Sequence, residues 1–201
     1  LQKWLLNSST KYHTTGSHNC TQQSEKGFVL FHLKNNTNFL LNTSNSNWPI
    51  PKDDYDLIYS KGVLVHVEMK DEIFQECHRL LKSGGLLVII DWLSSDKKKW
   101  GENIKRLVEL ENLALFPESV DGYIDILQRN GFTVLSIRDD SSEYLRFNRE
   151  IVERLQDSEQ TGSYLSFFNE GELEAAIEGY KSIANAFETR EVRAIRFVVQ
   201  K

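Results

Sequence analysis

Residues 55–93 decide the fold of this chain; they read YDLIYSKGVLVHVEMKDEIFQECHRLLKSGGLLVIIDWL. Residues 55–60 are apolar and rich in strand-forming side chains, so they predict a β-strand. A helix is expected next, because apolar side chains recur at helical spacing: Ile73, Phe74, Cys77, Leu80 and Leu81. Ser83-Gly84-Gly85 is expected to end it, since glycine adopts the left-handed backbone that a helix C-terminus needs. Residues 86–90 are a continuous apolar run, which is typical of a parallel strand covered on both faces.

The rest of the chain continues this alternation. The patterns predict helices over 102–115, from Ser119 or Val120 to Asn130, over 143–157 and over 169–187, with strands over 132–137 and 193–199. Strands that alternate with helices predict an α/β fold, a mostly parallel sheet with helices on both faces. We expect one domain over residues 1–201, in which residues 1–54 are polar and weakly patterned, 55–140 strongly patterned, and 141–201 charged and mostly helical.

Composition excludes several classes of protein. A net charge of -5 gives no support for nucleic-acid binding, which needs a basic face. No apolar run approaches the roughly 20 residues of a membrane span. No signal peptide is recognisable, and the two cysteines, Cys20 and Cys77, fit neither a disulfide framework nor a zinc site, so a cytoplasmic setting is expected. The histidines at 13, 32 and 78 have no ligand partners at metal spacing, so no metal is expected.

Several blocks of this chain resemble the class I S-adenosylmethionine-dependent methyltransferases. The blocks are KYHTTGSHNC at 11–20, YDLIYSKGVLVHV at 55–67, IFQECHRLLKSGGLLVIIDWLSSDKKKW at 73–100 and DGYIDILQRNGF at 121–132. Within that class they are most similar to the phosphoethanolamine N-methyltransferases of the type-11 group. The resemblance implies a Rossmann-like sheet that is mostly parallel, with an antiparallel last strand. It also aligns residues 11–20 with the second strand, so the central first strand and its glycine-rich loop are missing from the chain.

The resemblance also implies where a cofactor and substrate would lie. The positions that would meet S-adenosylmethionine are His18, Asn19, Thr43, Ser44 and Lys61, and the first four lack the acidic side chains that the family uses there. His66 takes the place of the family's catalytic histidine, whose imidazole assists deprotonation of the amine. A polar residue at the start of a helix remains the alternative for this histidine.

The residues expected around the substrate differ from the family pattern. Gly62 stands where an aspartate would hold the amine, and Trp92 stands where an aromatic hydroxyl is expected. Leu107, Glu111 and Leu113 align with residues that bind a phosphate, and a glutamate there would repel it. Asp91 keeps its family position, although an aspartate after a strand often caps the next helix.

Three hypotheses remain open at this point. The chain is a small-molecule N-methyltransferase acting on an amine, impaired or inactive when isolated. Alternatively it is a non-catalytic, vestigial methyltransferase domain that serves as a scaffold, with an adjoining methyltransferase domain as a possible partner, or it is a partial product. The sequence that precedes Leu1 would discriminate among them.

Overall fold

A computed structural model describes residues 3–6, 12–16, 37–41, 48, 51–95, 99–157 and 169–201. The chain forms two compact units. The first contains Leu1–Asp91, Asp121–Arg138 and Arg196–Lys201, and the second contains Trp92–Val120 and Asp139–Ile195. The proposed division of the sequence at residues 54 and 140 stays a prediction.

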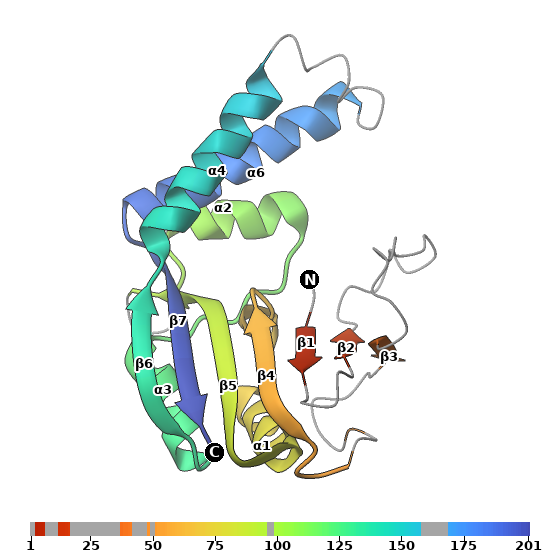
Figure 1. The fold of residues 1–201 in the computed structure, drawn as a ribbon. Coiled ribbons are helices and arrows are strands. Elements are labelled where there is room, and N and C mark those ends of the chain that lie inside the picture. The colour runs from red at the N-terminus through yellow and green to blue at the C-terminus, as the bar shows by residue number, and fades with distance from the viewer. Residues whose placement is uncertain are drawn as a thin grey trace. The chain divides into compact units, whose positions relative to one another are not determined.

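The first unit is built on a sheet whose strand order is β3-β2-β1-β4-β5-β7-β6 (Figure 1). Strand β4 is Tyr55–Lys61, β5 is Leu81–Ser94, β6 is Thr133–Asp139 and β7 is Val192–Gln200. Strands β4 and β5 are parallel, and β7 runs against its neighbours. This is the α/β, Rossmann-like methyltransferase sheet that the sequence predicts, with an antiparallel strand formed by the last residues of the chain.

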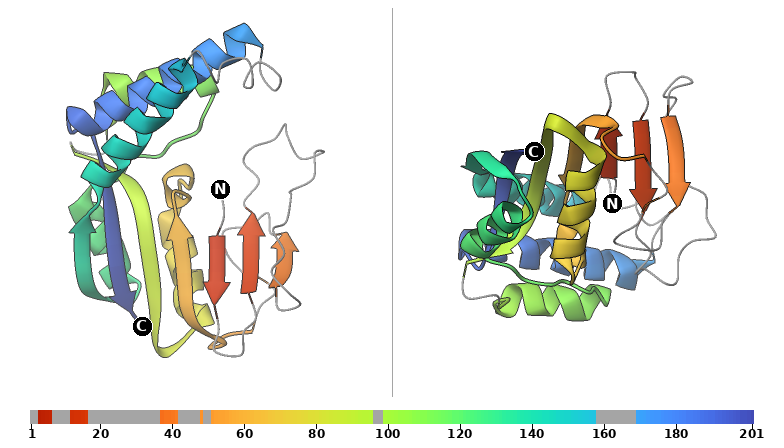
Figure 2. Two further views of the ribbon diagram at one scale, coloured as in Figure 1. Left: turned by 45° about the horizontal axis from the view of Figure 1, so that its top comes forward. Right: turned by 90° about the horizontal axis from the view of Figure 1, so that it is seen from below.

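Two helices cover one face of this sheet. They are α1, Lys70–Leu80, and α3, Val120–Arg129 (Figure 2). Phe74 of α1 meets Tyr123 of α3 edge to face at 5.7 Å between ring centroids, and Tyr123 stacks on Phe197 of β7 at 5.3 Å. Each of these aromatic side chains is fully buried, and burial of one such side chain stabilises the fold by about 1.5–3 kcal/mol. Both described helices of this unit share one face, and a helix on the opposite face stays a prediction.

The end of α1 differs from the expectation. The helix ends at Leu80, and Leu81 is already extended and paired with Tyr55 of β4, so Ser83-Gly84-Gly85 lies within β5 instead of ending the helix. Two backbone amides that precede β4 explain the early stop, because Asp53 and Asp54 donate to the carbonyls of Arg79 and Leu80 at 3.0 and 2.9 Å. The helix carbonyls are thus satisfied without a glycine cap.

Three short strands continue the sheet beyond β4. They are β1, Lys3–Leu6, β2, Tyr12–Gly16, and β3, Thr37–Leu41. Strand β1 lies beside β4 but runs antiparallel to it, with Lys3 opposite Ser60 and Leu6 opposite Leu57. Strands β2 and β3 are parallel to each other, and β2 is antiparallel to β1. Among the described residues, β1 therefore occupies the place beside β4 and runs in the opposite direction, and the absence of a parallel central strand from the chain stays a prediction.

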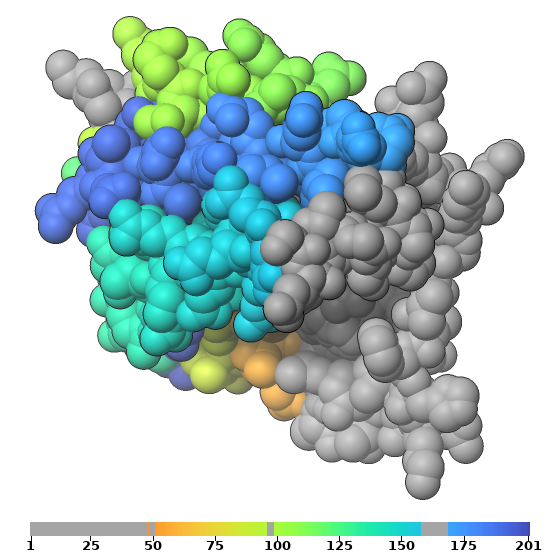
Figure 3. Space-filling model, turned by 90° about the horizontal axis from the view of Figure 1, so that it is seen from above, coloured from red at the N-terminus to blue at the C-terminus, as the bar shows by residue number. Residues whose placement is uncertain are grey.

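The second unit is a helical layer. Figure 3 shows its three long helices side by side: α2, Glu102–Glu111, α4, Ser141–Gln156, and α6, Glu170–Glu188. Its core is formed by apolar side chains of α2, α6 and β7: Ile104, Leu107, Ile183, Ala186, Phe187, Val192 and Ala194. Asn169 caps α6, because its side chain accepts from the Glu172 amide while Glu172 accepts from the Asn169 amide.

Helix boundaries in this unit agree with the sequence patterns except at one end. Helix α2 stops at Glu111 instead of residue 115, since Asn112 adopts a left-handed backbone with φ of 48°. Leu115 lies in the following loop, and its carbonyl accepts a hydrogen bond from the Trp100 indole at 3.1 Å. The expected helices over 143–157 and 169–187 are confirmed by α4 and α6.

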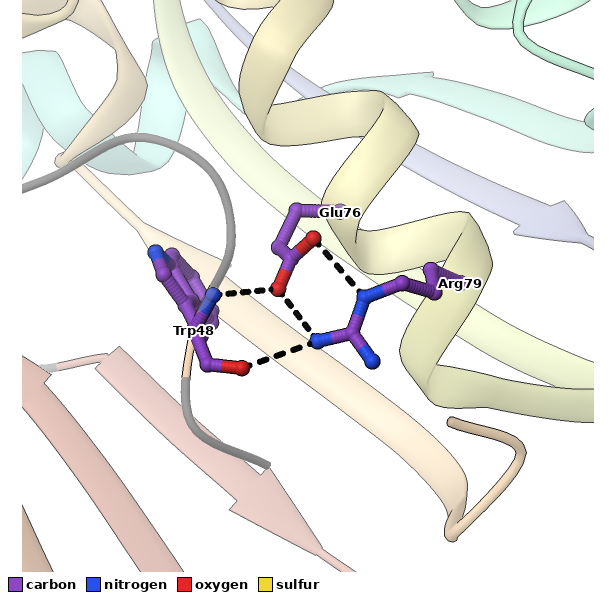
Figure 4. Close-up of polar contacts among 3 residues, drawn as sticks. All are labelled: Trp48, Glu76 and Arg79. Carbon is purple, nitrogen blue, oxygen red and sulfur yellow. Dashed lines mark hydrogen bonds and ion pairs between the residues drawn. The ribbon is translucent and has the colours of Figure 1, made fainter. Parts of the chain in front are cut away.

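The ion pair of Glu76 and Arg79 on α1 holds Trp48, which precedes β4 (Figure 4). The Glu76 carboxylate accepts from the backbone amide of Trp48 at 2.8 Å and from Arg79 Nε at 2.9 Å. Arg79 Nη2 also donates to the Trp48 carbonyl at 3.1 Å. Both backbone groups of Trp48 are therefore held by side chains of one helix, while its own indole is buried.

Candidate functional site

The carboxyl ends of β4 and β5 lie next to each other. Lys61 is opposite Ile90 in the parallel register, and the Gly62 amide donates to the Ile90 carbonyl at 2.8 Å. Lys61 and Gly62 therefore reach the same edge of the sheet as Asp91, the residue after Ile90. Ligands of open α/β sheets bind at this edge, outside the carboxyl ends of the strands.

Gly62 turns the chain sharply at this edge. Its φ is 60°, a left-handed conformation that glycine adopts without steric cost. Lys61, just before it, is exposed. The aspartate that the family resemblance places at position 62 is absent, and with glycine there the position has no side chain that could hold an amine.

His66 ends a short 3-10 helix, η1, Leu64–His66. Leu64 and Val65 are buried and anchor this turn, and the His66 amide donates to the Val63 carbonyl at 3.0 Å. The imidazole is half-buried. One short connection thus carries Lys61, Gly62 and His66, and a catalytic role for His66 stays a prediction.

Asp91 is not a helix cap, the role considered for it from sequence. It lies inside β5, is 1% exposed, and its Oδ2 accepts a hydrogen bond from the Tyr123 hydroxyl at 2.6 Å. Sequence reasoning did not identify Tyr123 as its partner. The available signal was the DGYIDIL block, where this tyrosine interrupts the otherwise aliphatic buried stripe of α3.

Trp92 belongs to the second unit, where it contributes to packing. Its ring meets Phe187 of α6 edge to face at 5.7 Å between centroids, and it packs against the core of that unit. Part of the indole remains accessible. The expected role of Trp92 in substrate binding is not tested by this contact, which gives its ring a structural role.

The positions aligned with phosphate-binding residues lie on and just after α2. Leu107 is buried in the core of the second unit. Burial raises the pKa of the Glu111 carboxyl above its ordinary value. Its Oε1 also lies against Gly179 of α6, 2.9 Å from where a Cβ would be. A carboxyl group at this position offers no positive charge to a phosphate.

The expected cofactor positions fall mostly outside the described residues. His18, Asn19, Thr43 and Ser44 are not among them, and Lys61 alone is. Strands β2 and β3 end at Gly16 and Leu41, just before those positions, and they run in the same direction as β4. Their carboxyl ends therefore lie at the same edge of the sheet as Lys61, as the resemblance requires.

Strand β1 does not fit a cofactor site of this kind. A glycine-rich loop that approaches a bound cofactor has to follow the carboxyl end of a parallel central strand. Because β1 is antiparallel to β4, its carboxyl end at Leu6 lies beside Leu57, toward the opposite edge of the sheet. The described residues contain no such loop, and β1 does not have the strand direction that would deliver one to the cofactor edge.

Two other kinds of site are absent from the described part of the chain. It contains no cluster of His, Cys, Asp and Glu side chains that could hold a metal ion. None of its helices has the length and apolar composition needed to cross a membrane.

Comparison with known proteins shows the family. Residues 13–137 match the family described as a methyltransferase domain, which is more than half of the chain, so this protein belongs to the methyltransferase domain family. The phosphoethanolamine N-methyltransferase of Plasmodium falciparum (isolate 3D7) is 30% identical over 132 residues, which are 65% of this chain and 48% of that enzyme. Phosphoethanolamine N-methyltransferase 1 of Arabidopsis thaliana is 24% identical, over 66% of this chain and 26% of that enzyme. The chain thus spans less than half of either relative.

Solved structures share the fold. Phosphoethanolamine N-methyltransferase 2 of Haemonchus contortus, in complex with phosphomonomethylethanolamine and S-adenosylhomocysteine, matches with a TM-score of 0.69 at 16% identity, over 82% of this chain and 37% of that one. A cyclopropane synthase of Mycobacterium tuberculosis matches with a TM-score of 0.69 at 16% identity, over 84% and 62%. At such identities the likeness concerns the fold alone.

Proposed function

We propose that this chain is a methyltransferase-like domain, related to small-molecule phosphobase N-methyltransferases, that is impaired or inactive by itself. The observation that carries the proposal is the direction of β1, whose carboxyl end lies at the opposite edge of the sheet from those of β2, β3, β4 and β5. Among the described residues, no strand therefore delivers a loop to a cofactor from the middle of the sheet.

The acceptor side supports the same proposal. Catalysis of methyl transfer to an amine depends chiefly on holding the amine in line with the methyl donor. Gly62 has no side chain with which to hold it, and the Trp92 indole packs on Phe187. His66 keeps a position from which an imidazole could accept a proton, but a base without a positioned amine contributes little.

The same changes at the cofactor and acceptor positions also favour a second function, that of a scaffold or interaction module. The fold persists with complete cores while the groups expected at its cofactor and acceptor positions are changed, and a fold alone does not imply an activity. In that case an adjoining, complete methyltransferase domain would be the natural partner. Residence in the cytoplasm stays an expectation from the cysteine content.

Cofactor binding tests the proposal directly. Isothermal titration calorimetry with S-adenosylmethionine and with S-adenosylhomocysteine should detect no binding at ligand concentrations of about 1 mM. A dissociation constant of that size corresponds to a binding free energy of roughly -4 kcal/mol. Phosphoethanolamine N-methyltransferase 2 of Haemonchus contortus, which is known in complex with both ligands, serves as the positive control, and circular dichroism of the same sample shows whether this chain is folded.

A micromolar dissociation constant, which is a binding free energy of roughly -8 kcal/mol, would overturn the proposal that the chain is impaired by itself. Phosphoethanolamine and unphosphorylated amines would then be assayed as methyl acceptors. A loss of turnover in His66→Ala with unchanged cofactor affinity would assign the histidine to catalysis, and equal turnover in the variant and the parent protein would remove it from the site.

A further inference from the structure

Strand β6 forms an outer edge of the sheet. It is the last strand in the order, so within the described part of the chain it has a neighbour, β7, on one side only (Figure 1). The unpaired backbone groups of such an edge can pair with another strand, and proteins usually protect them with lysine, proline, a bulge or a covering segment. Residues 133–137 of β6 read TVLSI and carry no charge and no proline.

The side chains of β6 are unusually apolar for an edge. Leu135 is 52% exposed and Ile137 is 43% exposed, and because they are two residues apart they point to the same face. Few other large apolar side chains of the described residues are as exposed. The edge thus offers both open backbone groups and a small apolar surface beside them.

A second copy of β6 would complement this edge. Antiparallel pairing of a strand with its own copy follows a two-fold axis, so it closes at a dimer. When Ser136 is centred on that axis, Leu135 lies opposite Ile137 of the other copy, and the four exposed apolar side chains meet on one face. Cross-strand apolar pairs of this kind each contribute roughly 0.2–1 kcal/mol.

The charges of β6 do not oppose this pairing. In the same register Arg138 faces Val134 of the other copy and Asp139 faces Thr133, so no like charges meet. Asp139 is also neutralised within its own chain, because Arg193 Nε donates to its Oδ2 at 3.1 Å. Like charges directly opposite would destabilise the pair, and their absence favours a copy of this chain as the occupant.

We infer that β6 is a self-association edge, through which two copies of this chain join their sheets by antiparallel β6–β6 pairing centred on Ser136. The interaction is independent of any methyl transfer. It rests on the open edge, the exposure of Leu135 and Ile137, and the charge pattern of the strand.

Light scattering coupled to size exclusion tests the association. The mass of the protein should rise from one chain toward two over concentrations on the order of 1 to 100 µM, a range that corresponds to a weak interface. Ile137→Lys should remain a single chain throughout, because it places a charge against Leu135 of the other copy. Phe147→Lys is the matched control, since Phe147 is 60% exposed on α4 and should leave association unchanged.

Cysteine cross-linking tests the register in a background in which Cys20 and Cys77 are replaced by Ser and Ala. Opposed residues of an antiparallel pair have Cα atoms about 4.5–5.5 Å apart, which suits a disulfide. Ser136→Cys should therefore give a covalent dimer on oxidation, and Arg138→Cys should not. A protein that stays a single chain at the highest concentration overturns the inference, as does equal cross-linking of the two variants or loss of association in Phe147→Lys.

Discussion

At the scale of single residues, Arg79 balances a carboxylate that the fold buries. The Glu76 side chain is 5% exposed and receives two of its hydrogen bonds from Arg79. Arg79→Ala would leave that charge with fewer donors in a place that water does not reach, which should lower the free energy of unfolding by about 1–3 kcal/mol. Urea denaturation followed by tryptophan fluorescence measures the loss.

The matched control for this prediction is Arg106→Ala. Arg106 pairs with Glu178, but both side chains are well exposed, at 59% and 41%, so the loss should stay below about 1 kcal/mol. Equal losses in the two variants would show that burial of Glu76 does not determine the strength of its ion pair.

His78 gives the stability of the fold a pH dependence of known sign. Burial, and to a lesser degree the Lys201 ammonium, hold the pKa of His78 below its ordinary value of 6.5, while Asp53 opposes them. The unfolded chain therefore takes up this proton at a higher pH than the folded chain. The contribution of His78 to stability is present above pH 6.5 and is lost as the pH falls through 6.5 toward the folded-state pKa.

Unfolding free energies of the wild type and of His78→Gln measured across this window test the prediction. The wild type should lose stability on acidification, and the variant should show a flatter profile between about pH 7.5 and 5. Asp53 and Asp71, whose pKa values are lowered, change charge below their ordinary 3.8, and Glu111, whose pKa is raised, contributes equally to both proteins. An identical slope in both proteins would contradict the assignment to His78.

At the scale of elements, Gly84 bends the first part of β5. Its φ is 78°, and the Cβ of an alanine there would meet only Gln200 Nε2 within 4 Å, at 3.9 Å. Gly84→Ala should therefore cost about 1–2 kcal/mol from backbone strain alone, without a clash. Gly171→Ala is the contrasting variant, because Gly171 lies in the first turn of α6 and alanine there should stabilise the helix by up to about 1 kcal/mol.

Thermal unfolding of the two variants separates these effects. Opposite shifts of the midpoint are expected, downward for Gly84→Ala and upward for Gly171→Ala. A neutral Gly84→Ala would mean that this part of β5 readily adopts another backbone conformation.

The type of each element could be predicted because the pattern that determines it is local. The residue at which an element ends was harder to predict, because groups distant in the sequence determine it. The apolar spacing of α1 depends on neighbouring turns, so it is visible in the sequence. Its end at Leu80 depends on amides of Asp53 and Asp54, more than twenty residues earlier in the chain. The same holds for Asp91, whose partner Tyr123 is brought to it by the fold of α3.

At the scale of the whole molecule, strand direction was the feature that sequence could not supply. A strand pattern has no intrinsic direction relative to its neighbours, so Lys3–Leu6 could not be placed beside β4 in advance. The family pattern predicts that a parallel central strand is missing, and the described residues leave that a prediction. It could not foresee what would occupy the position.

Strands β5 and β7 each pass from one compact unit into the other, at Asp91 and at Ile195. A strand cannot lose half of its ladder without loosening the other half, so the described elements should unfold as one cooperative system despite their division into two units.

Ile183→Val tests this, because it removes one methyl group from the core of the second unit and should cost about 0.5–1.5 kcal/mol. Urea titrations would be followed by two signals. Far-ultraviolet circular dichroism reports on all elements. The fluorescence of Trp48 reports on the first unit, in a background where Trp4, Trp92 and Trp100 are replaced by Phe. Both signals should shift to the same lower midpoint, since destabilisation of one unit is then shared by the other. A shift of the dichroism midpoint with an unchanged Trp48 midpoint would show that the two units unfold independently and that the shared strands do not couple them.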